Sequence, residues 1–308
     1  MQLRFSNGPE YNRLRRVLMY RPGEEVKRVD ESNYRDMLYR RPIDYKLLLK
    51  QFNTLVDILR GEDVDVILLN DLFDEVGWKP SYIPPNLMFM RDVLGVLKDL
   101  VILGNMTYEA RRMEPFILGE VLKRLGYSKV HPMGGKKFFE GGDLMFLNED
   151  YLLIGYGPRT SFPAAWEISG LALEMGFNTL LVAMPSFRVH LDGGMMPLDK
   201  DLILAHIPTL DYYPSMVVYR DGSKDIVNAY KFLMELGYTF IDVDDDESRT
   251  FGPNVVVLDR LKVISYNWNS KTLKNLREYG VDVIEFDGTE FRGSGGGPHC
   301  TFNTVERG

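Results

Sequence analysis

The sequence repeats one pattern of strands and turns at intervals of about 50 residues, a period typical of radial and solenoid architectures. Each repeat has two short apolar runs separated by a charged turn, which is the composition of a β-hairpin. The four turns are centred near residues 98, 149, 200 and 260. The paired runs are Val93–Leu97 with Leu100–Leu103, Leu144–Leu147 with Tyr151–Ile154, Met195–Leu198 with Leu202–Ala205, and Asn254–Leu258 with Leu261–Ser265. We therefore expect a fold that is built from similar hairpin units.

Helix-like stretches follow most of the hairpins, because apolar residues recur there at helical spacing. These predicted helices are Tyr108–Leu125, Ser161–Met175, Lys224–Leu236 and Ser270–Tyr279. A further apolar run, such as Thr179–Ala183 or Val281–Phe286, follows each helix, so the unit is strand, strand, helix, strand. A fifth unit is predicted near the N-terminus from the strand Arg16–Tyr20, the helix Tyr45–Arg60 and the strand Val64–Leu69.

Five such units predict an α/β fold, a closed five-bladed propeller of strand-strand-helix-strand units. A chain of 308 residues is long enough for one large domain or two medium ones. The repetition favours a single domain over residues 1–308. An ordinary doubly wound sheet is the alternative, and we favour the propeller because paired hairpins are not the connection pattern of a doubly wound sheet.

The composition excludes several classes of function. One cysteine forms no intramolecular disulfide and builds no multi-cysteine zinc or iron–sulfur site. Four scattered histidines argue against a histidine-rich metal centre. Lysine and arginine number 37 against 44 acidic residues, and the net charge of −7 argues against nucleic acid as the main partner. We therefore expect neither a metal nor another cofactor.

The sequence also bears on compartment and assembly. The N-terminal segment has no apolar region of the kind found in secretory signals. No stretch approaches the roughly 20 apolar residues of a membrane span, so we expect no membrane partner. The reduced use of cysteine is typical of a cytoplasmic protein. The oligomeric state stays open, and a homo-oligomer is compatible with the sequence.

Four short motifs carry side chains suited to chemistry, and three of them stand at the same place in the repeat, just before a hairpin. They are Pro85–Asp92, Phe139–Asp143, His190–Gly194 and Gly295–Cys300. Taken singly, a Gly-Gly-Asp sequence is a turn, and a single histidine or cysteine is commonly a buried core residue. Independent turns, however, have no reason to place Glu, His and Asp at matching points. In a radial fold these points converge on the axis, so the motifs predict one shared cavity.

The four motifs, in this order, resemble those of the guanidino-group-modifying superfamily, whose members have the five-bladed α/β propeller called the pentein fold. Within it the similarity is greatest to arginine deiminase, from about Arg13 to Arg307. The resemblance implies that Asp92 and Asp192 bind the guanidinium, that Glu140 and His190 handle protons, and that Cys300 is the nucleophile. It also implies further substrate-binding residues, namely Asp143, Asn86, Arg111 and Arg159, with Arg112 as an alternative to Arg111.

The implied reaction converts L-arginine and water into L-citrulline and ammonia. A thiolate attacks the central guanidino carbon and forms a covalent thiouronium intermediate, which water then hydrolyses. His190 protonates the leaving nitrogen and later activates water. Carboxylates near Cys300 raise the pKa of its thiol, so we expect a thiol that ionises when the cationic substrate binds. The cysteine, histidine and glutamate require no metal for this chemistry.

Two departures from the family and several alternatives bear on this hypothesis. The chain has no room between Gly104 and His131 for an extra helical segment, and Ser294-Gly295 stands where a basic residue is common. An amidinotransferase, in which an amine replaces water, is the first alternative. A dihydrolase is the second, although relatives of that type tend to have Asn in place of Asp92. A non-enzymatic binder is the third, and that class would lose Cys, His and Glu.

The remaining histidines are expected to be structural. His131 and His206 adjoin strand-like runs. His299 precedes Cys300, and in an extended segment their side chains would point in opposite directions, so we assign His299 no role.

Overall fold

The computed structural model describes residues 3–308, and each predicted hairpin is present there as two antiparallel strands. The four hairpins lie in four of the five separate sheets, and the fifth sheet contains β1 (Leu14–Met19), β2 (Asp65–Leu68) and β17 (Phe302–Arg307). In each sheet one strand (the second strand of the hairpin in four sheets, and β1 in the fifth) pairs in parallel with a strand that follows it after a helical connection. The structure therefore contains no single doubly wound sheet within the described residues.

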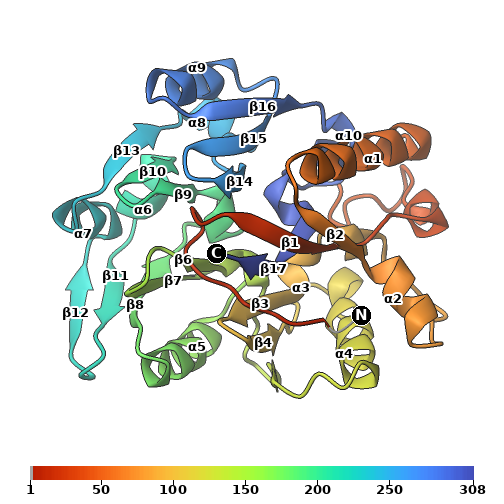
Figure 1. Ribbon diagram of the computed structural model, residues 1–308, viewed down its shortest axis with the longest axis horizontal. Coiled ribbons are helices and arrows are strands. Elements are labelled where there is room, and N and C mark those ends of the chain that lie inside the picture. The colour runs from red at the N-terminus through yellow and green to blue at the C-terminus, as the bar shows by residue number, and fades with distance from the viewer. Residues whose placement is uncertain (1–2) are drawn as a thin grey trace.

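Two sheets contain only the predicted unit. One has β3 (Leu94–Leu97), β4 (Leu100–Leu103), α4 (Glu114–Arg124) and β5 (Val130–Pro132). The other has β14 (Val256–Asp259), β15 (Lys262–Tyr266), α9 (Ser270–Glu278) and β16 (Asp282–Phe286). Figure 1 shows both helices at the periphery of the molecule, outside the strands that they connect.

A third sheet is extended by a hairpin that belongs to the next unit along the chain. It consists of β6 (Leu144–Phe146), β7 (Tyr151–Tyr156) and β8 (Asn178–Ala183), joined by α5 (Phe162–Glu174), together with β11 (Ser215–Val218) and β12 (Lys224–Val227). The fourth sheet has β9 (Met195–Asp199), β10 (Leu202–Ala205) and β13 (Thr239–Asp242), with α6 (Ile207–Asp211) and α7 (Ala229–Glu235) in the connection.

The fifth sheet joins the two ends of the chain. Strand β1 (Leu14–Met19) pairs in parallel with β2 (Asp65–Leu68) after helix α1 (Tyr45–Gly61), as the N-terminal unit predicts. Its other neighbour is β17 (Phe302–Arg307), which pairs with it antiparallel and which the sequence analysis missed. The C-terminal strand thus holds the segment just before it against the N-terminal sheet.

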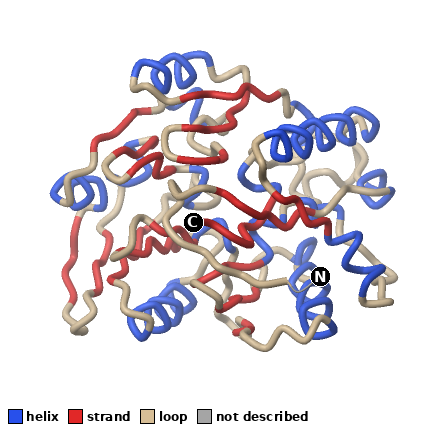
Figure 2. The backbone as a smooth tube through the Cα atoms, viewed as in Figure 1, coloured by secondary structure: helices blue, strands red, loops and turns tan. Residues whose placement is uncertain are grey.

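Short helices complete the chain, and helices lie outside most of the strands, whereas the hairpin of β11 and β12 reaches the left edge of the molecule (Figure 2). The short helices are α2 (Leu69–Glu75), α3 (Met90–Val93), α8 (Asp245–Ser248) and α10 (Thr289–Gly293). The apolar faces of sheets and helices form three buried clusters, so the core is spread over the units. No helix within residues 3–308 is both long and apolar enough to cross a bilayer.

Two predicted helices have wrong starting points. Residues 224–227 form strand β12, because the preceding turn folds this segment back on β11. Helix α7 starts only after Asn228, which caps it by accepting a hydrogen bond from the Lys231 N–H. Helix α4 begins at Glu114 and not near Tyr108, with Pro115 in its first turn, where proline needs no hydrogen-bond partner.

Candidate active site

All four motifs form a short helical turn immediately before a strand, which is the first strand of a hairpin for three of them and β17 for the fourth. Asp92 lies in α3 before β3, and Asp143 ends a 3-10 turn before β6. Asp192 lies in a 3-10 turn before β9, and Cys300 in one before β17. The fourth motif thus occupies the same place as the other three, which the sequence did not reveal because β17 pairs with a strand at the opposite end of the chain.

Residues of three of these motifs line one cavity of about 600 Å³, and the motif at 139–143 does not line it. Seven of the nine predicted site residues line it, namely Asn86, Asp92, Arg111, Arg159, His190, Asp192 and Cys300. Glu140 and Asp143 do not line it and are fully buried behind its wall. The floor therefore presents two carboxylates, an imidazole and a thiol.

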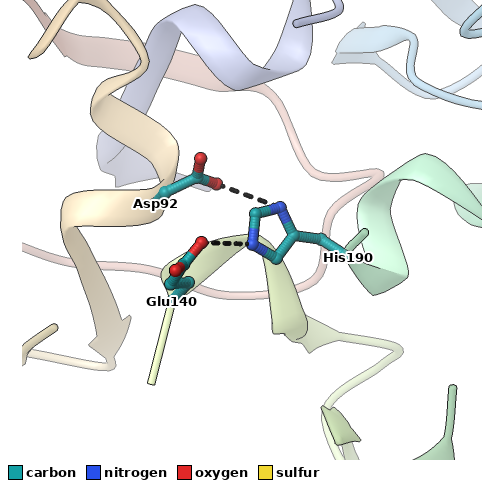
Figure 3. A group of neighbouring side chains, drawn as sticks. All are labelled: Asp92, Glu140 and His190. Carbon is teal, nitrogen blue, oxygen red and sulfur yellow. Dashed lines mark hydrogen bonds and ion pairs between the residues drawn. The ribbon is translucent and has the colours of Figure 1, made fainter. Parts of the chain in front are cut away.

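His190 lies between two carboxylates, as Figure 3 shows. Its Nε2 is 2.8 Å from a carboxylate oxygen of Glu140, and its Nδ1 is 3.4 Å from Asp92. Burial alone would lower the pKa of His190. This effect is outweighed by the charge of Asp92, the hydrogen bond to Glu140 and the charge of Asp143, which together raise the pKa to about 9. His190 is therefore an imidazolium at neutral pH and has a proton to donate.

Glu140 connects His190 with Arg159. The Nη1 of Arg159 donates to Glu140 at 2.6 Å, and the backbone N–H of Thr107 donates to its other oxygen. Burial opposes ionisation of Glu140, yet His190 and Arg159 prevail and lower its pKa to about 2. Glu140 is thus a permanent anion that orients the imidazole, although it does not face the cavity.

Cys300 is buried and has two weak hydrogen-bond partners. The Gly297 N–H points to its sulfur at 3.4 Å, and the thiol donates to Asn254 Oδ1 at 3.6 Å. Burial raises the pKa of the Cys300 thiol well above its usual value, and the charges of Asp192 and Asp92 raise it further. The free protein therefore holds a neutral thiol, and a cation between the two aspartates would favour its ionisation.

Asn254 and His299 are site residues that sequence reasoning missed. Asn254 bonds to the backbone of both Asp192 and His299, and it lines the cavity. The expectation that His299 lies in an extended segment is wrong, because residues 299–301 form a 3-10 turn. Its Nδ1 is 2.8 Å from Asp192, and although burial opposes ionisation, this contact lowers the pKa of Asp192.

Arg111 is committed to protein carboxylates. Its guanidinium donates to Glu114 through Nε and Nη2 and to Asp92 through Nη1 at 2.5 Å, and Nη2 also reaches the Phe89 carbonyl. Few of its N–H groups are left for a substrate. The alternative, Arg112, pairs with Glu109 on the surface and does not line the cavity.

Asn86 and Asp143 also have partners in the protein. The amide of Asn86 donates to the Met37 carbonyl at 2.7 Å, and Asn86 lines the cavity. Asp143 accepts the backbone N–H of Leu191 at 2.9 Å and so fixes the residue next to His190. Burial raises the pKa of Asp143 to about 6, against the opposing influence of His190.

The other two histidines both contact carboxylates of the protein, and His206 also lines the cavity. His131 meets Glu167 at 2.7 Å on the outside of the molecule. His206 is buried among Arg188, Thr209 and Asp245.

Three site residues have ligand atoms close enough together to hold one metal ion. Ligand atoms of Asp92, Glu140 and His190 lie within 4.8 Å of one another. Both carboxylates are already paired with guanidinium groups, Asp92 with Arg111 and Glu140 with Arg159. A divalent ion would face two neighbouring positive charges there, so the donor set does not fit a metal well.

Two glycines are needed where backbone meets reactive side chains. A Cβ on Gly297 would stand 2.1 Å from Asn254 Oδ1, and one on Gly142 would stand 2.8 Å from the His190 ring and 3.0 Å from Asp92 Oδ1. The glycines in these motifs therefore allow close approach, in addition to forming turns.

We expect Gly142→Ala to lower kcat by about tenfold to a hundredfold, because a shift of His190 and Asp92 by a fraction of an ångström spoils their geometry. Steady-state kinetics check this. The matched control is Gly134→Ala, where an added Cβ meets nothing within 4 Å. Equal activity in the two variants would show that the close packing of Gly142 has no bearing on the site.

Comparison with known proteins finds one family. A family model described as arginine deiminase matches residues 79–307. The uncharacterised protein YkgA of Bacillus subtilis is 25% identical over 308 aligned residues, which cover 97% of this chain and 94% of YkgA. An arginine deiminase of Staphylococcus epidermidis is 26% identical over 259 residues, which cover 72% of this chain. The match spans 62% of that deiminase, less than two thirds of its length.

Solved structures show the same fold at low sequence identity. A dimethylarginine dimethylaminohydrolase of Pseudomonas aeruginosa, in complex with citrulline, superposes with a TM-score of 0.71 at 21% identity, over 94% of this chain and 98% of that one. The N-terminal domain of ArgZ, a cyanobacterial arginine dihydrolase bound to its product, gives a TM-score of 0.73 at 20% identity, over 95% and 97%. The α/β mixed-sheet fold therefore matches pentein structures.

Proposed function

This chain belongs to the arginine deiminase family, and from that membership we propose that it converts L-arginine and water into L-citrulline and ammonia. The family makes it a hydrolase that acts on the C–N bonds of guanidino groups. The observation that carries the finer proposal is the cavity floor, where Cys300 lies with Asp92, Asp192 and the imidazolium of His190.

In the proposed first step, Asp92 and Asp192 bind the guanidinium and fix its plane. The bound cation lowers the pKa of the Cys300 thiol, and the sulfur attacks the central carbon. His190 donates its proton to one terminal nitrogen and is left neutral, while the proton that the thiol loses passes to solvent. The carbon–nitrogen bond breaks, ammonia leaves, and the carbon stays bound to sulfur as a thiouronium.

In the second step, water attacks the same carbon. His190 accepts a proton from the water, the carbon–sulfur bond breaks, and citrulline and the Cys300 thiol are released. The hydrogen bond of His190 to Glu140 supports both steps, because it fixes the ring and stabilises the imidazolium that forms again.

The remaining predicted residues fit around this centre. We propose that Asn86 and Arg159 contact the amino-acid end of the substrate, since both line the cavity and Arg159 is 12% exposed. The contacts of Arg111 support a role in positioning Asp92, and the contact of Asp143 supports a role in positioning His190 through Leu191. For Arg111 and Asp143 we therefore propose positioning roles in place of the contacts with the substrate that the resemblance implies.

We also propose that the five sheets are the blades of a propeller within one domain. Their shared pairing pattern supports this, as does the cavity that residues of three of the four motifs line together. The proposed compartment is the cytoplasm, where a free nucleophilic thiol stays reduced. A partner other than the small guanidino substrate is not needed for the reaction, and a homo-oligomer is compatible with it.

Product analysis tests the proposed reaction. Purified protein with L-arginine alone should give citrulline and ammonia in equal amounts, because water attacks the intermediate. Turnover that requires an added amine such as glycine would instead identify an amidinotransferase. Ornithine with additional ammonia would identify a dihydrolase, as ArgZ is.

A further inference from the structure

His299 is fully buried between two carboxylates, one of which belongs to the cavity floor. It does not line the cavity, although Asp192 beside it and Cys300 next to it in the sequence do. Its Nδ1 is 2.8 Å from Oδ2 of Asp192, and its Nε2 is 3.9 Å from Oε2 of Glu10. Neither this nitrogen nor this Glu10 oxygen has a hydrogen-bond partner among the described residues. The imidazole therefore lies between a carboxylate at the cavity and a carboxylate behind it.

His190 lies between two carboxylates in the same orientation. Its Nδ1 faces Asp92 and its Nε2 faces Glu140 (Figure 3). Asp92 and Asp192 both line the cavity. Glu140 and Glu10 are both fully buried and do not line it. The site thus contains two imidazoles between carboxylates, and each set ends at one of the two aspartates that we propose bind the guanidinium.

The two imidazoles differ in their access to the cavity. His190 lines the cavity, so it can exchange a proton with a bound substrate. His299 is fully buried, so it acts on the floor only through its contacts with the protein, of which the hydrogen bond to Asp192 is one. A second link runs through Asn254, whose side chain accepts the His299 backbone N–H and donates to the Asp192 carbonyl, both at 3.1 Å. His299 and Asp192 are therefore held together at two points.

The charge of Asp192 depends on His299. Burial opposes ionisation of Asp192, and the contact with His299 is the strongest influence that lowers its pKa, ahead of the charges of His190 and Arg91. An ionised carboxylate only accepts hydrogen bonds, so Nδ1 of His299 is the donor. The titratable and charged side chains that face Asp192 are His299, His190, Arg91, Arg188 and Cys300.

Glu10 is an anion on the far side of His299. Burial opposes its ionisation, but the charge of Arg91, the contact with His299 and the charge of Arg307 prevail and lower the pKa of Glu10 to about 2. The Nη2 of each of these arginines lies 3.5 Å from the carboxylate. The charge of Glu10 attracts the Nε2 edge of the imidazole, so that Nδ1 stays turned toward Asp192.

We propose that His299, with Glu10 behind it, is a positioning residue that fixes the Asp192 carboxylate and keeps it an anion for binding the guanidinium. This inference rests on the proposed function, in which Asp192 binds that group. Without the hydrogen bond from Nδ1, burial favours the neutral acid, which attracts a cation less. His299 should therefore matter for a cationic ligand and much less for a neutral ligand of the same shape.

The test compares binding of L-arginine with that of L-citrulline, which has a neutral ureido group in place of the guanidinium. Calorimetry in the Cys300→Ser background measures both without turnover. His299→Asn and His299→Gln are a matched pair, because the amide of asparagine can replace Nδ1 and that of glutamine can replace Nε2. His299→Gln should weaken L-arginine binding by about tenfold to a hundredfold, the loss expected for a hydrogen bond to a charged group. It should change L-citrulline binding only slightly, and His299→Asn should retain most of the affinity for L-arginine.

The pH dependence gives a second readout from the same titrations. Without His299, Asp192 takes up a proton more readily, so the loss of L-arginine affinity in His299→Gln should grow as the pH falls below neutral. His131→Gln is the control, because His131 pairs with Glu167 outside the cavity, and it should bind both ligands as the parent does.

Equal losses for the two ligands in His299→Gln would show that the contact only supports the local structure, and would overturn the assignment. Equal L-arginine affinities in His299→Asn and His299→Gln would overturn it as well. If His299→Gln does not fold, Glu10→Gln removes the charge behind the imidazole at constant size and should also weaken L-arginine binding selectively. Unchanged L-arginine affinity in that variant would then contradict the proposal. The selective loss supports the role of His299 even if the wild type releases no citrulline from L-arginine.

Discussion

Replacing Cys300 by serine is expected to lower kcat by at least about a thousandfold, the scale seen when a covalent nucleophile is removed. The structure offers no substitute, because Cys300 is the one cysteine of the chain and lies alone on the floor between the aspartates. A serine hydroxyl is far harder to ionise than a thiol, and nothing at this site would make it a nucleophile. Citrulline formation under saturating L-arginine measures the loss.

The same variant should still fold and bind substrate. The guanidinium is bound by Asp92 and Asp192, so calorimetry should detect L-arginine binding to Cys300→Ser with little change in affinity, and thermal unfolding should shift by no more than a few degrees. Activity equal to that of the wild type would contradict the covalent mechanism. If Cys300→Ser neither folds nor binds L-arginine, Cys300→Ala serves as the second variant for the same measurements.

His190→Gln is expected to reduce kcat by about a hundredfold to ten-thousandfold, since general acid–base catalysis contributes that much. Glutamine can keep a hydrogen bond to Glu140 but carries no transferable proton. The matched control is His131→Gln, because His131 also pairs with a glutamate yet lies outside the cavity. Comparable activity in the two variants would remove His190 from the mechanism.

The pH profile of the wild type supplies a second check on His190. Its pKa of about 9 means that the imidazolium is present at neutral pH and is lost as the pH rises through 9. Single-turnover rates of ammonia release should therefore fall on the alkaline side near this value, and the fall should disappear in His190→Gln. A rate that increases steadily through this range would show that ammonia leaves without a proton from His190.

The parts of the fold that depend on neighbouring residues could be predicted from the sequence. A hairpin is specified by its own apolar runs and turn, and all four predicted hairpins are present. Strand β17 was missed because its partner, β1, lies at the opposite end of the chain. Residues 224–227 were assigned to a helix because their apolar spacing suits a helix, whereas pairing with β11 decides their structure.

The site shows the same division between local and long-range information. The motifs led to the residues that line the cavity floor, but not to their partners. Asn254 has no signal of its own in the sequence, since it acts by bonding to the Asp192 and His299 backbones. A sequence also does not tell which buried carboxylates face the cavity, and so Glu140 and Asp143 were not distinguished from Asp92.

The most direct test of the covalent mechanism is mass spectrometry of the protein quenched in acid during turnover of L-arginine. Formation of the thiouronium adds arginine and removes ammonia, so the peptide containing Cys300 should gain the mass of arginine less that of ammonia. The wild type should show this adduct and Cys300→Ser should not. A gain of only the amidino group would indicate transfer to an amine, and rapid citrulline formation with an unmodified Cys300 at every quench time would contradict the account.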